Sequence, residues 1–134
     1  SRGLGDVYKR QARFLNSEGN LLMDLNFSLS ETYTGKLWID GKKIYEKTIN
    51  IGTLPNNGNS GVKNVAHGIS QLDRVIDIRG IAVSGTETIP LPHNNPWVLG
   101  ETVTIRVSGA NITVDTNSNK SSYTGYVTLK YTKK

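Results

Sequence analysis

The residues that could carry out catalysis are few in this chain and do not form a recognisable catalytic motif. There is no cysteine, and the only histidines are His67 and His93. A hydrolytic triad needs a nucleophile, a histidine base and an orienting acid, but neither histidine lies in a Gly-x-Ser-x-Gly or comparable segment. A three-histidine or HExxH metal site is excluded. We therefore expect no enzymatic activity, no metal and no cofactor, and a structural role for His67 at a strand end.

The acidic residues are scattered along the chain, and no two of them are singled out as a glycosidase pair. Such enzymes need two carboxyl groups about 5–10 Å apart. Asp40 belongs to a turn-like Asp-Gly, and Asp73 and Asp77 are expected on solvent-facing sides of strands. The chain is therefore expected to bind rather than to cleave.

Two loops carry side chains that suit carbohydrate binding. Sugar sites typically place an aromatic platform beside amide and hydroxyl groups on exposed loops. The loops span residues 92–97 and 117–123, and both are rich in asparagine. The candidate ligand-binding residues are His93, Asn94, Asn95, Trp97, Asn119 and Tyr123. The alternative is that the two aromatic residues anchor their loops to the core and that the asparagines are ordinary turn formers.

The elements that must position these loops are expected to be β-strands. Apolar and polar residues alternate along residues 102–107, 111–115 and 123–131, as in strands with one buried face. Similar segments recur about every ten residues and indicate seven to nine strands, which is typical of sandwiches and barrels. The sequence thus predicts an all-β fold, namely an antiparallel β-sandwich that is jelly-roll-like.

The predicted sandwich is expected to begin with a β-hairpin. Residues 33–39 and 42–51 are rich in strand formers and flank Asp40-Gly41. This dipeptide predicts a type I′ turn, in which both central residues have positive φ. Trp38 is expected in the core or at a subunit interface.

Three further segments complete the expected order of elements. Residues 62–66 are expected as a short strand, and residues 68–74 as one helical turn before a strand at 75–83. Residues 84–96 are expected as a loop, because prolines cannot pair within a central strand.

The N-terminal part of the chain is expected to lie outside the sandwich domain. Residues 1–11 read SRGLGDVYKRQ, which resembles the translation of a transposase-based sequencing adapter fused to a metagenomic reading frame. We expect this segment to be non-native and the natural protein to be longer; the alternative is an ordinary N-terminal arm. Residues 12–32 are expected as a strand or connector, with alternation from Leu21 to Leu29. Residues 33–134 are expected as the sandwich.

The formal net charge of +5 does not by itself indicate nucleic-acid binding. Without the first 11 residues the charge falls to +3, which is ordinary for a small domain. Four lysines gather near the first hairpin, but lysine is also the common protection of strand edges against aggregation. They are Lys36, Lys42, Lys43 and Lys47. We expect no nucleic-acid partner, and no membrane insertion because no apolar run reaches about 18 residues.

Four short segments follow one another along residues 33–134. The segments are WIDGK at 38–42, LPNN at 54–57, VAHGIS-x-LD at 65–73 and YTK at 131–133. In this order they resemble the C-terminal domain of tail-fibre and baseplate-type proteins from phages of Gram-positive gut and dairy bacteria. The resemblance covers residues 33–134, about three quarters of the chain. The family often has proline at the position of Lys43, and no family binding motif can be transferred to this chain.

The resemblance implies a location in the virion and, commonly for such distal modules, a homotrimer. We therefore expect a non-catalytic module at the tip of a tail fibre or baseplate that binds a host cell-wall glycan beside other virion proteins. The alternatives are a structural component, such as a head fibre or capsid decoration protein, and an accessory carbohydrate-binding module of a phage hydrolase.

Overall fold

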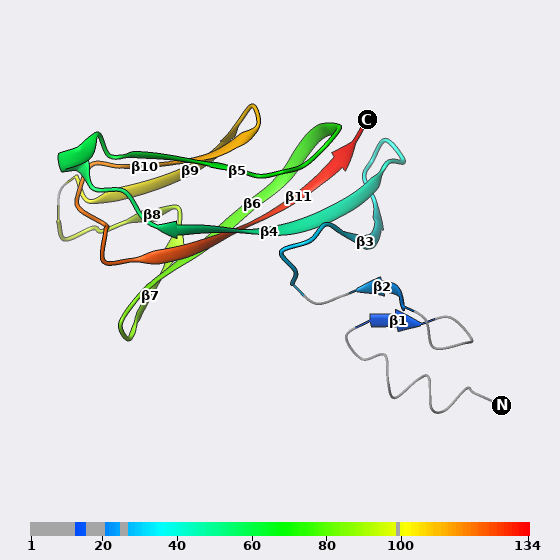
Figure 1. Cartoon of the computed structure of the whole chain (residues 1–134), viewed down its shortest axis with the longest axis horizontal. Helices are drawn as coiled ribbons and strands as arrows, with labels where there is room; N and C mark the ends of the chain where they lie inside the picture. The colour runs from blue at the N-terminus through cyan, green and yellow to red at the C-terminus, as the bar shows by residue number, and fades with distance from the viewer. Residues whose placement is uncertain (1–12, 16–20, 25–26, 99) are drawn as a thin grey trace.

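The computed structural model describes residues 13–15, 21–24, 27–98 and 100–134. In these residues the chain forms an antiparallel β-sandwich of nine strands in two sheets, accompanied by a two-stranded hairpin (Figure 1). The predicted all-β sandwich of seven to nine strands is confirmed. Residues 1–11, interpreted as an adapter, lie outside the described residues.

Each sheet combines strands that are far apart in the sequence. The five-stranded sheet has the order β3 (Thr32–Leu37), β4 (Lys43–Thr53), β11 (Thr124–Lys133), β6 (Leu72–Ser84) and β7 (Glu87–Leu91). The four-stranded sheet has the order β5 (Val62–Ala66), β10 (Asn111–Thr116), β9 (Thr102–Ser108) and β8 (His93–Asn94). A 3-10 turn, η1 (Asn57–Asn59), precedes β5.

The hairpin of β1 (Arg13–Leu15) and β2 (Leu21–Asp24) is separate from both sheets. The alternation from Leu21 to Leu29 predicted one strand over this whole segment, whereas β2 spans Leu21–Asp24 and residues 25–26 lie outside the described part of the chain. Phe27 and Leu29 lie outside any strand and are exposed. Alternation alone therefore overestimated this strand, because it does not show where pairing stops.

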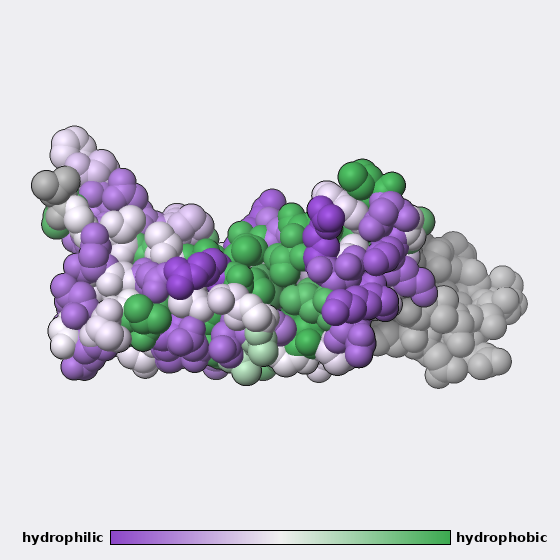
Figure 2. Space-filling model, turned by 90° about the horizontal axis from the view of Figure 1, so that it is seen from above, coloured by the Kyte–Doolittle hydropathy of each residue, from purple (hydrophilic) through white to green (hydrophobic). Residues whose placement is uncertain are grey.

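The core lies between the two sheets, where the alternation along the strands predicted it. On β11, Val127, Leu129 and Tyr131 are fully buried. Ile112 and Val114 of β10 are equally buried in the opposite sheet. At the margin of the core, several hydrophobic residues remain partly exposed. Figure 2 shows apolar surface (green) in the middle of the face seen from above, with polar areas (purple) on either side.

The segment 84–96 is not the loop that its prolines predicted. Residues 87–91 form strand β7, in which Pro90 pairs with Ile81 of β6. This pairing is tolerated because β7 is an edge strand, so no strand on its other side needs the missing N–H. The chain then passes through the cis Leu91–Pro92 peptide into β8, in the other sheet.

The hairpin of β3 and β4 forms as predicted, but with a different turn. The Gly41 N–H donates to the Trp38 carbonyl (2.9 Å), and the Trp38 N–H donates to the Lys42 carbonyl (2.8 Å). Among the described non-glycine residues only Ser60 and Gln71 have positive φ, so Asp40 cannot be in a type I′ turn. The loop is a type I turn on Ile39 and Asp40, followed by Gly41 at φ 86° as a G1 bulge.

Residues 68–74 do not form the predicted helical turn, and the His67 side chain binds the start of this segment instead. Its Nδ1 accepts from the Ile69 N–H (3.0 Å), so Nε2 carries the proton and donates to the Gly109 carbonyl (2.9 Å). Gly68 and Gln71 have positive φ, which is incompatible with a right-handed turn. The predicted structural role of His67, which is 3% exposed, is confirmed.

Most of the lysines near the first hairpin bind groups of the chain itself. The Lys42 ammonium pairs with Asp73 (2.8 Å), and the Lys47 ammonium donates to the His67 carbonyl (2.7 Å). The Lys43 Nζ lies 5.2 Å from the centroid of the Tyr33 ring. These lysines therefore serve intramolecular contacts instead of forming a free basic patch.

Candidate functional site

Three loops meet at one end of the sandwich, where the chain crosses between the sheets (Figure 1). The 54–61 loop joins β4 to β5, the 92–101 loop surrounds β8, and the 117–123 loop joins β10 to β11. The predicted binding residues lie on the 92–101 loop and on the 117–123 loop. The structure thus brings together two segments that are separate in the sequence.

Backbone hydrogen bonds fix the 117–123 loop on the 54–61 loop. The Lys120 N–H donates to the Pro55 carbonyl (3.1 Å), and the Leu54 N–H donates to the Tyr123 carbonyl (2.9 Å). Asn56 and Asn119 form an isolated antiparallel β-bridge. Because these bonds use main-chain atoms, the two loops form one layer whose shape depends little on side-chain rotamers.

The 92–101 loop is closed by hydrogen bonds around Asn95. The Asn95 N–H donates to the Glu101 carbonyl (3.0 Å), and the Asn95 Oδ1 accepts from the Trp97 N–H (3.0 Å). The Val98 N–H donates to the Asn95 carbonyl (3.4 Å). Asn95 therefore shapes the loop through both its backbone and its side chain, as asparagine does in Asx turns.

An ion pair joins the 92–101 loop to the 117–123 loop. The Lys120 ammonium contacts the Glu101 carboxylate, and Lys120 is only 4% exposed. Beside it, the Thr102 N–H donates to the Asn117 Oδ1 (2.9 Å). A buried ammonium needs a close partner of opposite charge, so this pair holds the two loops in a defined relation.

The Lys120 hydrogen bond lowers the pKa of Glu101 below its ordinary value of 4.5, and the nearby His93 and the Asn95 side chain lower it further. A depressed carboxyl pKa contributes stability above the unfolded pKa and loses it as the pH falls through the folded value. We expect wild-type protein to have a higher melting temperature than Glu101→Gln at pH 7, and this difference to shrink as the pH falls below about 4.5. Melting curves from pH 7 to pH 3 measure it; a difference independent of pH would contradict the assignment.

Trp97 is the most exposed aromatic residue among the predicted candidates. Its relative exposure is 91%, so the interpretation that it anchors the loop to the core is wrong. The loop is held by Asn95 and by the ion pair of Glu101, so the indole is not needed for anchoring. A large apolar ring left exposed on a fixed loop is a typical feature of binding surfaces.

Tyr123 and Asn119 belong instead to the support beneath the loops. Tyr123 is half-buried against the core, and its hydroxyl donates to Glu87, which raises the pKa of Tyr123 to about 12. The Asn119 Oδ1 accepts from the backbone N–H (3.0 Å) and the hydroxyl (2.7 Å) of Ser121. Because these polar groups are already bound within the chain, the alternative of a structural role is favoured for both residues.

The candidate surface is therefore the 92–101 loop, where His93 is half-buried and Asn94 and Trp97 are exposed. Sequence analysis missed Glu101 and Lys120, which fix this loop. They are 19 positions apart and lie in no motif, so no local signal could have paired them.

In the part of the chain that the structure describes, no group of three or more acidic or histidine side chains could hold a metal ion. In the same part, no helix has the length and apolar character needed to cross a membrane. Comparisons with protein-family models, with curated proteins and with solved structures found no match to this chain.

Proposed function

We propose that this chain is a non-catalytic module of a phage virion that binds a host cell-wall carbohydrate through the 92–101 loop. The observation that supports the proposal most is the exposed Trp97 indole on a loop whose backbone is fixed by hydrogen bonds. An indole offers a flat apolar face to a sugar ring, and preformed sites lose less conformational entropy on binding. Asn94, on the same loop, is also exposed, and its amide group can bind sugar hydroxyls.

The location in a tail fibre or baseplate rests on the resemblance of residues 38–42, 54–57, 65–73 and 131–133 to phage proteins of that type. Such a module would act as a homotrimer beside other virion proteins. Single sugar sites are weak, and three linked sites raise the apparent affinity without any new contact. Trimerisation therefore complements a small binding surface built around one aromatic residue.

A structural role in the virion, as a head fibre or capsid decoration protein, is the second candidate function. It is favoured by a different observation, namely the exposed apolar residues on the outer face of the five-stranded sheet, such as Ile81 and Tyr126. An accessory module of a phage hydrolase would use the same sugar site as a tail module. Attachment to cells separates binding from a purely structural role.

Replacement of Trp97 by alanine is expected to weaken binding to cell-wall polysaccharide from Gram-positive bacteria by at least about tenfold, because the indole is the central contact. The measurement is isothermal titration of the full chain with purified wall polysaccharides. Ile39→Ala is the matched control, because Ile39 is also 91% exposed but lies in the β3–β4 turn.

The control variant should bind like wild type, and both variants should retain the wild-type melting temperature. If no wall polysaccharide binds the wild-type chain, the carbohydrate proposal fails. If Trp97→Ala and wild type bind equally well, the site lies elsewhere on the molecule.

A further inference from the structure

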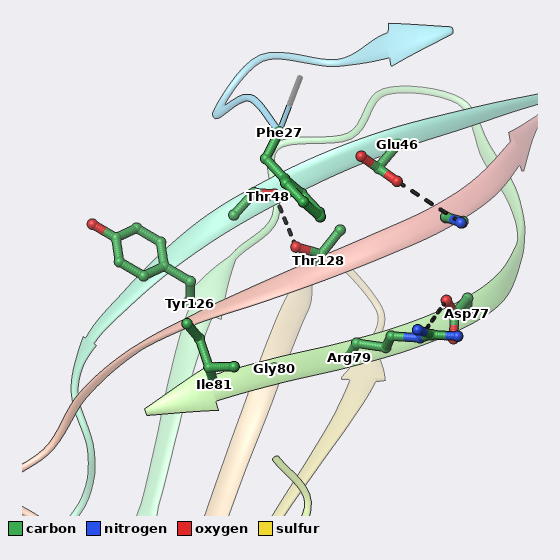
Figure 3. Close-up of a pocket in the computed structure, with 10 residues that line it drawn as sticks. Phe27, Glu46, Thr48, Asp77, Arg79, Gly80, Ile81, Tyr126 and Thr128 are labelled. Atoms are coloured by element: carbon green, nitrogen blue, oxygen red, sulfur yellow. Dashed lines mark hydrogen bonds and ion pairs between the residues drawn. The ribbon is translucent and has the colours of Figure 1, made fainter. Parts of the chain in front are cut away.

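The outer face of the five-stranded sheet, which points away from the four-stranded sheet, carries a groove of about 470 Å³ (Figure 3). Its lining comes from the three central strands β4, β11 and β6, with Phe27 at one side. On β11 the residues that alternate with the buried ones point to this face, and Tyr126 and Thr128 are among them.

The groove lies within an apolar area that solvent reaches. Relative exposure is 77% for Phe27, 48% for Ile81 and 45% for Tyr126. Val83, two residues beyond Ile81 on the same face of β6, is 38% exposed. Exposed apolar side chains that gather around a groove mark an interaction surface, whereas scattered ones do not.

Most polar side chains that line the groove contact one another in pairs. The Thr48 and Thr128 hydroxyls are 2.9 Å apart, and the Asp77 carboxylate lies 3.0 Å from the Arg79 guanidinium. The Glu46 carboxylate lies 4.0 Å from the Lys130 ammonium. Few groups remain to recognise a polar small molecule, so apolar packing is the main interaction that this face offers.

The charges of the face favour a second copy of this chain as its partner. The four charged residues that line the groove, Glu46, Asp77, Arg79 and Lys130, sum to zero, whereas the chain carries a net charge of +5. Two copies repel each other through that net charge, and least where the approaching surfaces are neutral. Because positive and negative side chains are equal in number here, three copies that turn this face toward a common three-fold axis meet no surplus of like charge.

A partner of this groove packs against side chains rather than adding a strand. The groove opens on the face of the sheet, and its lining strands β4, β11 and β6 each have a neighbouring strand on both sides for at least part of their length. We propose that the outer face around the groove is the surface through which copies of this chain associate. In the trimer proposed above, on which this inference rests, each copy turns this face to its neighbour.

The test is the mass of the full chain in solution, measured by light scattering over a series of concentrations. We expect three times 14.7 kDa for the wild type. Ile81→Glu and Tyr126→Lys place opposite charges on the face, and each should weaken association by at least about thirtyfold. Val62→Glu is the matched control, because Val62 is 45% exposed on β5 of the other sheet and should leave the mass unchanged.

A second measurement does not depend on disruptive variants. The chain contains no cysteine, so Ile81→Cys and Val62→Cys each introduce a single thiol. A maleimide should label the Ile81→Cys variant much more slowly in the oligomer than after dilution to single chains. The Val62→Cys variant should be labelled at the same rate at both concentrations.

Three results would overturn the inference: a wild-type chain that is monomeric at every concentration, face variants that remain trimeric, or a Val62→Glu variant that dissociates equally. None of these three results bears on sugar binding by Trp97, which is measured separately by titrating the chain with wall polysaccharides.

Discussion

Replacement of Leu129 by alanine is expected to lower the free energy of unfolding by about 3 kcal/mol, within the usual range of about 2–5 kcal/mol for such a change. Leu129 is fully buried on β11, the central strand of the five-stranded sheet, opposite Lys47 of β4 and Ile78 of β6. Strands on both sides hold the backbone in place, so the surroundings cannot collapse into the space left by the missing methyl groups.

Chemical denaturation measures this loss of stability, and the dependence on denaturant should stay close to that of the wild type. Lys130→Ala is the control, because Lys130 is the next residue on the same strand but lines the outer face. It should cost less than about 0.5–1 kcal/mol, since its ion pair with Glu46 is partly exposed. Equal losses for the two variants would show that β11 does not separate a buried face from an outer one.

Replacement of Gly61 by alanine is expected to lower the free energy of unfolding by at least about 2 kcal/mol, because two costs add. Gly61 has φ 70°, where a side chain alone costs about 1–2 kcal/mol. A Cβ at this position would also lie 2.2 Å from the Thr116 carbonyl oxygen, which is a backbone atom. Thr116 belongs to β10, and its N–H donates to the Gly61 carbonyl (2.8 Å). The overlap between the Cβ and the Thr116 carbonyl oxygen can therefore be relieved only if the 54–61 loop moves away from β10.

Gly109→Ala separates the two costs. Gly109 has φ 58°, but a Cβ there meets no atom within 4 Å, so its loss of stability reflects the backbone conformation alone. The difference between the two variants in chemical denaturation is the cost of the overlap. If Gly61→Ala is no more destabilised than Gly109→Ala, the close approach of the loop to Thr116 is not a feature of the folded protein. Because the 54–61 loop supports the 117–123 loop, Gly61→Ala should also reduce binding by the neighbouring Trp97 loop.

The amino-acid sequence by itself determined the class of fold and most of the strands. Residues 62–66 were predicted as a strand and form β5 without any shift, and the buried face of β11 follows the alternation of Val127, Leu129 and Tyr131. Such features are local, because the side chains of a strand point alternately to its two faces. The errors lie where strand pairing decides the outcome. Strand β7 forms despite Pro90 because it is an edge strand, and Phe27 and Leu29 lie outside any strand despite the alternation.

Only the tertiary structure decided which side chains are free to meet another molecule. The sequence placed Trp97 and Tyr123 in two equivalent asparagine-rich loops, but the fold exposes the first and binds the second to Glu87. The contact of Lys120 with Glu101, and the gathering of Phe27, Ile81 and Tyr126 around one groove, join residues that are far apart in the chain. Exposure depends on how the sheets pack and where the loops cross between them, and a residue's immediate sequence neighbours carry no information about either.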